Sequence, residues 1–166
     1  MYCMLSIWGK KNNFESGGEI LANFSKRKLE QEKNMKNGQI KRKVKLAGMG
    51  RVLAGDVITF HGETRYRLLP GETLLDLVCL AAGRALEQAD REIGDVDCIV
   101  CAMATPLQAI PCNAALVHER MAKGTEIPAM DINTTCTSFI SALDVMSCMV
   151  EAGRHQTVLI VSGDTA

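Results

Sequence analysis

Short apolar runs alternate with amphipathic stretches between residues 44 and 166, and this alternation constrains the fold more than any other feature. The runs "DCIVCAMA" (97–104) and "TVLIVS" (157–162) are apolar along nearly their whole length, which is typical of strands buried on both faces. In order, the pattern predicts strand, helix, strand, helix, strand, helix and strand. Such an order favours an α/β fold with a mixed, mostly parallel sheet, helices on both faces and right-handed crossovers.

The helices are predicted from apolar spacing and from their end signals. Thr73 is a suitable N-cap for the first helix. The predicted buried face of that helix consists of Leu74, Leu77, Val78, Ala81, Ala82, Ala85 and Leu86. A second helix opens near Pro111, and a third ends at Gly153. The core side of the third is predicted to hold Phe139, Leu143, Met146 and Val150. Residues 60–76 are polar and include Pro70-Gly71, so neither strand nor helix is assigned to most of them.

Residues 1–43 differ in composition from the rest of the chain. They hold ten Lys or Arg and four Glu, a net charge of +6, whereas residues 44–166 carry −6. A basic polar tail is predicted here, either as a solvated helix or as a disordered segment. Two further interpretations are a basic arm that binds RNA, and a non-native stretch upstream of a true start at Met35. The acidic charge of residues 44–166 argues against a nucleic-acid partner.

The composition also bounds where the protein works. No apolar run approaches the roughly 18 residues of a membrane span, and the N-terminus does not follow the order of a secretory signal. The seven cysteines are odd in number and irregularly spaced, which favours reduced thiols in the cytoplasm. Cys98 and Cys101 form a C-x-x-C pair inside a predicted strand, so they are interpreted as core residues and no metal site is predicted.

Cys136 is the candidate nucleophile. It lies where a predicted strand, "IPAMDIN" (127–133), turns into the third helix. The start of a helix carries partial positive charge and unpaired N–H groups, which favour a thiolate and can bind an oxyanion. The neighbours Thr134, Thr135, Thr137 and Ser138 are small, and their hydroxyls are expected to cap the helix.

The alternative is that Cys136 is an ordinary small core residue, and spacing alone favours this alternative. The same core interpretation is given to Cys3, Cys79, Cys98, Cys101, Cys112 and Cys148.

The segment "PAMDINTTCTSFISALDVMSCMVEAGRHQTVLIVSGD" resembles the active-site region of the β-ketoacyl-acyl-carrier-protein synthase III family, in the thiolase-like superfamily. The resemblance rests on Asp131, Cys136, Phe139, Gly153 and the cluster at 162–164. It extends over about residues 44–166. It implies the first half of a thiolase-like two-half fold, that is, a truncated N-terminal domain at 44–166.

The resemblance implies a condensing acyltransferase of fatty-acid biosynthesis. Cys136 would accept an acyl group from acyl-coenzyme A, and malonyl on acyl carrier protein would lose CO₂ and attack the thioester. It further implies no tightly bound cofactor, acyl carrier protein as partner and a homodimer. A His and an Asn from the second half would stabilise the enolate. His61, His118 and His155 are interpreted as surface residues instead, so the 166-residue chain alone is expected not to condense.

The chain departs from the family pattern at several places. Arg65 and Arg67 match an arginine-containing loop only loosely, so the residues that would bind coenzyme A stay unassigned, and Ile110 stands where the family often has an aromatic residue. Two alternatives therefore remain open. One is a related enzyme that makes polyketide or ester bonds. The other is a noncatalytic half-fold that associates with a separate second-half chain through exposed apolar surface.

Overall fold

A computed structural model describes residues 2–8 and 44–164. Four strands and three helices follow the predicted order: β2 (Lys45–Val52), α2 (Leu74–Gln88), β5 (Cys98–Cys101), α3 (Asn113–Met121), β6 (Ala129–Asp131), α4 (Ser138–Glu151) and β7 (Thr157–Ser162). A short 3₁₀ turn, η1 (Ile93–Asp95), precedes β5. The sheet has the strand order β2-β1-β7-β5-β6, with β5 parallel to both β6 and β7. The predicted α/β architecture is therefore confirmed.

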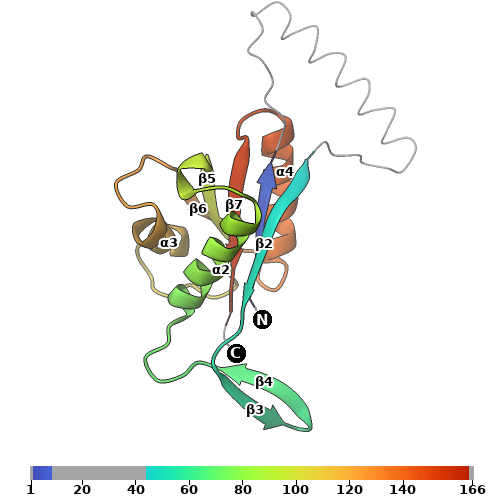
Figure 1. Ribbon diagram of the computed structural model, residues 1–166, viewed down its shortest axis with the longest axis vertical. Helices are drawn as coiled ribbons and strands as arrows, with labels where there is room; N and C mark the ends of the chain where they lie inside the picture. The colour runs from blue at the N-terminus through green and yellow to red at the C-terminus, as the bar shows by residue number, and fades with distance from the viewer. Residues whose placement is uncertain (1, 9–43, 165–166) are drawn as a thin grey trace, which may run out of the picture.

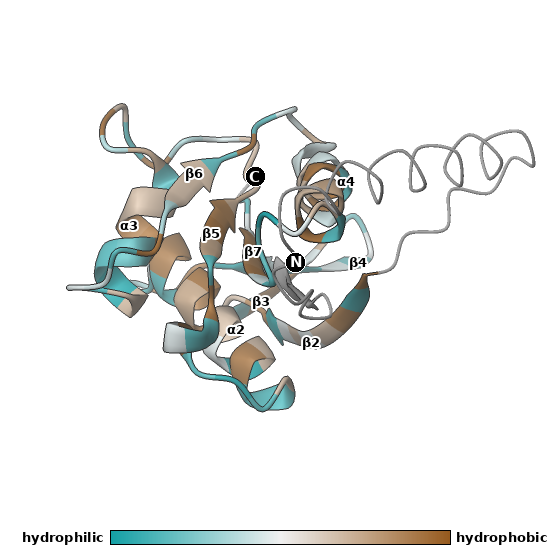
Figure 2. Ribbon diagram, turned by 90° about the horizontal axis from the view of Figure 1, so that it is seen from above, coloured by the Kyte–Doolittle hydropathy of each residue, from teal (hydrophilic) through white to brown (hydrophobic). Residues whose placement is uncertain are grey.

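Helices cover both faces of this sheet, as Figures 1 and 2 show. Successive side chains of a strand point to opposite faces. Ile99 and Leu159 accordingly join the core cluster under α2 and α3, whereas Val100 and Ile160 join the cluster under α4. All four are fully buried. The continuously apolar runs of the sequence are thus explained by two apolar faces on each central strand.

Helix α2 begins and packs as its sequence predicts. Thr73 is the N-cap, and its hydroxyl accepts a hydrogen bond from the Asp76 N–H at 3.1 Å. The buried residues of the helix are Leu74, Leu77, Val78, Ala81, Ala82, Ala85 and Leu86. On β2, a Cβ at Gly50 would stand 2.0 Å from the Ala81 carbonyl oxygen. Only glycine therefore permits this close approach of helix and strand.

The segment after β2 forms a hairpin, which the sequence pattern did not predict. Strands β3 (Asp56–Phe60) and β4 (Glu63–Arg67) pair antiparallel through a two-residue turn. His61 and Gly62 in that turn have φ values of 48° and 78°, the left-handed pair that tight hairpins require. The sequence shows little alternation of apolar and polar residues here, because most of the hairpin is exposed on both faces. Figure 1 shows the hairpin projecting from one end of the sheet.

The prediction of a tail over residues 1–43 is wrong for its first strand. Tyr2–Trp8 forms β1, which pairs antiparallel with both β2 and β7 inside the sheet. The physical reason is the short, largely apolar run "YCMLSIW", which precedes the charged part of the segment and has the composition of a strand. The tail predicted for residues 9–43, and a start at Met35, lie outside the described residues. The domain boundary at residue 44 stays a prediction.

Candidate active site

Cys136 lies in the turn that joins β6 to α4, at the carboxyl end of the parallel strands. The turn spans residues 132–137, with Thr137 as the N-cap residue of α4. Cys136 is exposed, so its sulfur is accessible to a reagent or a substrate. Cys136 is the residue before the N-cap, so it lies just outside α4 and not in its first turn. The carboxyl ends of strands are where sites gather in open α/β sheets.

Hydroxyl groups stabilise this turn, but they do not cap the helix as predicted. Thr137 makes no side-chain cap bond; its Oγ1 donates to the Thr134 carbonyl oxygen at 2.8 Å. Ser138, which is buried, accepts from the Thr134 N–H at 3.0 Å and donates to the Thr135 carbonyl oxygen at 2.6 Å. Short hydroxyl side chains readily hydrogen-bond to nearby backbone groups, and here their bonds join residues within the turn.

A second set of polar side chains ties together the loops that follow β5, β6 and β7. Asp131 accepts from the backbone N–H groups of Asn113 and Ala114 at 3.0 and 2.7 Å, and so it caps α3 from the end of β6. Asp164, just after β7, accepts from the Ala104 and Thr105 N–H groups at 3.0 and 3.1 Å. The two carboxylates therefore brace the loops around Cys136.

The amides of Asn113 and Asn133 belong to the same network. Asn113 is buried and accepts from the Leu107 N–H at 2.8 Å. Asn133 donates to the Ala104 carbonyl oxygen at 2.9 Å. Sequence reasoning missed both residues. Asn side chains favour turns and helix starts, where their amides bond to nearby backbone groups, and this preference was the available signal.

The cysteines divide into two groups by burial. Cys79, Cys98 and Cys101 are wholly or partly buried, and burial raises the pKa of each thiol, that of Cys79 to about 11. Cys136, Cys112 and Cys148 are exposed. The core interpretation of Cys112 and Cys148 is wrong, because Cys112 is the N-cap residue of α3 and Cys148 faces outward on α4. Cys3 is placed only through the backbone of β1.

The three histidines lie away from this turn. His61 is in the β3–β4 turn, and the His118 ring lies 3.3 Å from the Thr125 hydroxyl. His155 follows the C-terminal end of α4, opposite to Cys136. Arg65 and Arg67 form ion pairs with Glu63 and Asp56 on the hairpin. The surface assignment is confirmed for His61, which is exposed, whereas His118 and His155 are half-buried.

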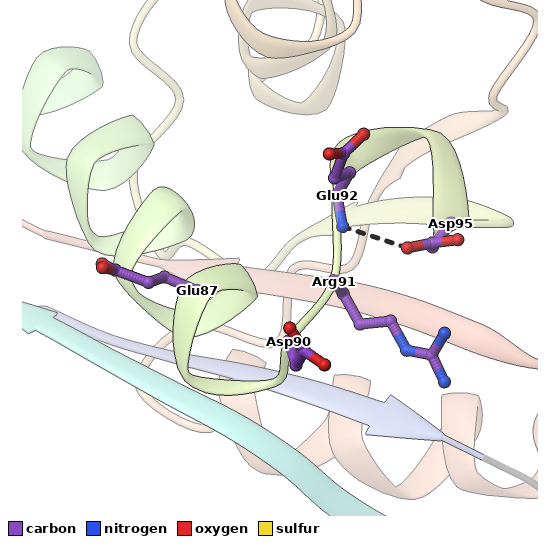
Figure 3. A pocket seen from close by; sticks show the side chains of 5 residues that line it. All are labelled: Glu87, Asp90, Arg91, Glu92 and Asp95. Atoms are coloured by element: carbon purple, nitrogen blue, oxygen red, sulfur yellow. Dashed lines mark hydrogen bonds between the residues drawn. The ribbon is translucent and has the colours of Figure 1, made fainter.

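One open pocket lies at the other end of the sheet, between α2 and η1. Figure 3 shows its lining: Glu87, Asp90, Arg91, Glu92 and Asp95, with the Glu92 N–H donating to Asp95 at 3.0 Å. No cysteine, serine or threonine lines it. Among residues 2–8 and 44–164, no group of three or more His, Cys, Asp or Glu is arranged to hold a metal ion. The same residues include no helix long and apolar enough to cross a membrane.

The fold and the turn define the class first: an α/β protein of the thiolase-like type, with an accessible cysteine ahead of a helix. Residues 130–166, which include Cys136, match the family model of 3-oxoacyl-[acyl-carrier-protein] synthase III. The chain is 36% identical over 101 residues to a β-ketoacyl-[acyl-carrier-protein] synthase III of Rhodospirillum rubrum, covering 61% of this chain and 31% of that protein. It is 39% identical to one from Xylella fastidiosa over the same shares.

A solved structure extends the match to the fold. The 3-oxoacyl-[acyl-carrier-protein] synthase III of Aquifex aeolicus VF5 superposes with a TM-score of 0.64 and 25% identity, covering 70% of this chain and 43% of that one. The chain is therefore related to the β-ketoacyl-acyl-carrier-protein synthase III family and corresponds to part of its members. It spans about a third of the length of the curated relatives that it matches.

Proposed function

We propose that this chain carries the nucleophile-bearing part of a condensing enzyme of the synthase III type, with Cys136 as the catalytic residue. The observation that carries the proposal is an exposed Cys136 in a braced turn ahead of α4, inside the segment that matches the family. The Cys136 thiolate would attack the carbonyl of an acyl-coenzyme A. Backbone N–H groups at the start of α4 would stabilise the oxyanion, and the coenzyme A thiolate would leave.

The second half-reaction would use malonyl on acyl carrier protein. Loss of CO₂ leaves an enolate, whose carbon attacks the Cys136 thioester, forming a 3-oxoacyl carrier protein and regenerating the thiol. His61, His118 and His155 lie away from Cys136, so the enolate-stabilising groups would come from elsewhere. We therefore expect the 166-residue chain alone to accept an acyl group without condensing it. Release of CO₂ from malonyl carrier protein above background would contradict this expectation.

Cellular context follows from the same proposal. Acyl-coenzyme A serves as a substrate rather than a resident cofactor, acyl carrier protein is the partner, and the complete enzyme is a homodimer in the cytoplasm. The support is the relationship to synthase III enzymes and the cysteine pattern.

The test of Cys136 is its reactivity relative to the other exposed thiols. The folded chain is treated with limiting iodoacetamide, and the modified peptides are quantified by mass spectrometry. Cys136 is expected to react faster than Cys112 and Cys148, because a catalytic nucleophile is more reactive than accessible thiols that have no catalytic role. Equal rates at the three exposed cysteines would contradict the proposal, since all three are accessible.

A noncatalytic half-fold is a second candidate, and helix α4 supports it. Its exposed half carries Ile140, Val145 and Met149, which are 64%, 42% and 41% exposed, and exposed apolar side chains can mediate association. The proposed occupant is a separate second-half chain. An Ile140→Lys variant is expected to abolish co-purification of this chain with such a partner, while Cys136 stays dispensable. Co-purification of the Ile140→Lys variant at the wild-type level would contradict this second candidate.

A further inference from the structure

The residue before Cys136 has a backbone conformation that its side chain disfavours. Thr135 has a φ of 56°, in the left-handed region where β-branched residues are outliers. Such a conformation persists only where surrounding groups hold it. Thr135 is joined directly to Cys136, so its backbone angles set the direction in which the chain presents the Cys136 side chain. Whatever holds Thr135 therefore also positions the sulfur.

Asn133 holds the Thr135 N–H, while Ser138 holds the Thr135 carbonyl oxygen through its own N–H and hydroxyl. The Asn133 Oδ1 accepts a hydrogen bond from the Thr135 N–H at 2.9 Å, which closes a local turn over two residues. Its Nδ2 donates to the Ala104 carbonyl oxygen at 2.9 Å, on a loop 29 residues earlier in the sequence. One amide therefore ties the left-handed residue to the backbone that follows β5.

The anchor at Ala104 is itself fixed. The Ala104 N–H donates to Asp164 at 3.0 Å, so both sides of this residue are hydrogen-bonded, one to the loop after β7 and the other to Asn133. Asn133 is exposed, and truncating its side chain opens no cavity in the core. An alanine at this position removes the two hydrogen bonds and leaves the core packing intact, which separates a positioning role from a packing role.

We propose that Asn133 is a positioning residue for Cys136, acting by holding Thr135 in its left-handed conformation. The inference rests on the proposed function, in which Cys136 is the nucleophile. Acyl transfer requires the attacking atom to be held close to its reaction geometry. Asn133 does not contact the reacting atoms. It holds the backbone of Thr135, the residue next to Cys136.

The test is a cycle of four full-length chains: wild type, Asn133→Ala, Thr135→Gly and the double variant. Glycine adopts positive φ without steric cost, so a chain with Thr135→Gly no longer needs Asn133. The measured quantity is the iodoacetamide rate at Cys136 as a function of pH, with Cys112 and Cys148 as internal references. Asn133→Ala is expected to slow Cys136 roughly three- to tenfold, the worth of about one hydrogen bond. In the double variant the rate is expected to return to that of Thr135→Gly alone.

The inference is overturned if Asn133→Ala leaves the Cys136 rate unchanged, or lowers it equally with and without Thr135→Gly. Protection of the buried Cys98 verifies that each variant is folded. Should Asn133→Ala expose Cys98, the milder Asn133→Ser variant replaces it. Its hydroxyl keeps a weaker bond to the Thr135 N–H, so an intermediate rate is expected, and an unchanged rate overturns the inference.

Gln108→Ala is the matched control, because Gln108 lies on the same loop system but its side chain, within residues 2–8 and 44–164, bonds to the Ile110 carbonyl oxygen and not to residues 133–136. Its Cys136 rate is expected to equal that of the wild type. In the wild type, an iodoacetamide rate at Cys136 no higher than that at Cys112 would contradict the proposed function. The coupling between residues 133 and 135 is measured from the four variants and does not depend on that comparison.

Discussion

At the residue scale, the reactivity of each cysteine depends on what surrounds its sulfur. A thiol in an apolar environment stays protonated because burial disfavours the thiolate, and this applies to Cys79, Cys98 and Cys101. An exposed thiol does not carry this desolvation cost. Cys136 and Cys112 both lie ahead of helices and both are exposed. Of these two, Cys136 is the one that lies in the segment matching the synthase III family model, residues 130–166.

Burial predicts a pH dependence for alkylation of the folded chain. Near pH 8, we expect iodoacetamide to modify Cys112, Cys136 and Cys148 but not Cys79, whose thiol has a pKa of about 11. A raised pKa means that the neutral thiol persists as the pH rises, so Cys79 gains reactivity only as the pH approaches that value. Peptide mass spectrometry after short labelling pulses is the measurement. Rapid modification of Cys79 at neutral pH, with folding verified by circular dichroism, would contradict the assignment.

At the scale of elements, the packing of β2 against α2 depends on glycine. A Cβ at Gly50 would stand 2.0 Å from the Ala81 carbonyl oxygen, which is backbone and does not yield. Gly50→Ala is therefore expected to lower the free energy of unfolding by about 1–3 kcal/mol or more. Gly83→Ala on α2 is the matched control, because its Cβ meets no atom within 4 Å and helix propensity should raise stability by about 0.5–1 kcal/mol. Urea titration measures both, and equal effects of the two changes would refute the close approach.

The N-cap of α2 provides a second prediction at this scale. Thr73→Ala removes the bond to the Asp76 N–H and is expected to cost about 1 kcal/mol of unfolding free energy. Thr73→Ser keeps the hydroxyl and should cost much less.

The effect of Thr73→Ala on the free energy of unfolding is also expected to depend on pH. The Thr73 hydroxyl, and then Arg120, lower the pKa of Asp76 below 3.8. A depressed carboxyl pKa contributes stability above the unfolded value, and that contribution is lost as the pH falls through the folded value. The difference between wild type and Thr73→Ala should therefore narrow below about pH 3.8. A difference that widens in acid would contradict this interaction.

At the scale of the whole molecule, β1 completes the sheet. It lies between β2 and β7 and pairs antiparallel with both, so it connects β2 to the rest of the sheet. In the register of β1 and β2, Cys3 is paired with Arg51, and Leu5 with Met49. Directly paired residues have Cα atoms about 4.5–5.5 Å apart, within the range of a disulfide. We expect an Arg51→Cys variant to form a disulfide with Cys3 under mild oxidation, seen by non-reducing peptide mapping.

The control for this crosslink is Met49→Cys, which is displaced by two residues along the strand and is expected not to crosslink to Cys3. Crosslinking at both positions, or at neither, would show that Tyr2–Trp8 does not hold this register. A Cys3→Ser background identifies disulfides formed by the other thiols.

How far the sequence predicts this molecule depends on whether the signal is local. The buried face of α2 and the central strands were predictable because apolar spacing reports burial directly. Strand β1 was missed because its pairing partners lie far along the chain, and the β3–β4 hairpin because most of its residues are exposed. Cys136 was selected as a candidate from its neighbours in sequence, and its catalytic role stays a prediction. The proposed role of Asn133 could not be selected in this way, because it includes a hydrogen bond to Ala104, on a loop that only the fold brings close.

The central claim is that Cys136 is a nucleophile toward thioesters, and acyl transfer measures this most directly. The full chain is incubated with acetyl-coenzyme A, and its peptides are mapped by mass spectrometry under conditions that preserve thioesters. An acetyl group is expected on Cys136, absent from Cys112 and Cys148 and absent throughout a Cys136→Ser variant. Acetylation spread equally over the exposed cysteines, or no acetylation of Cys136 in a folded chain, would contradict the claim.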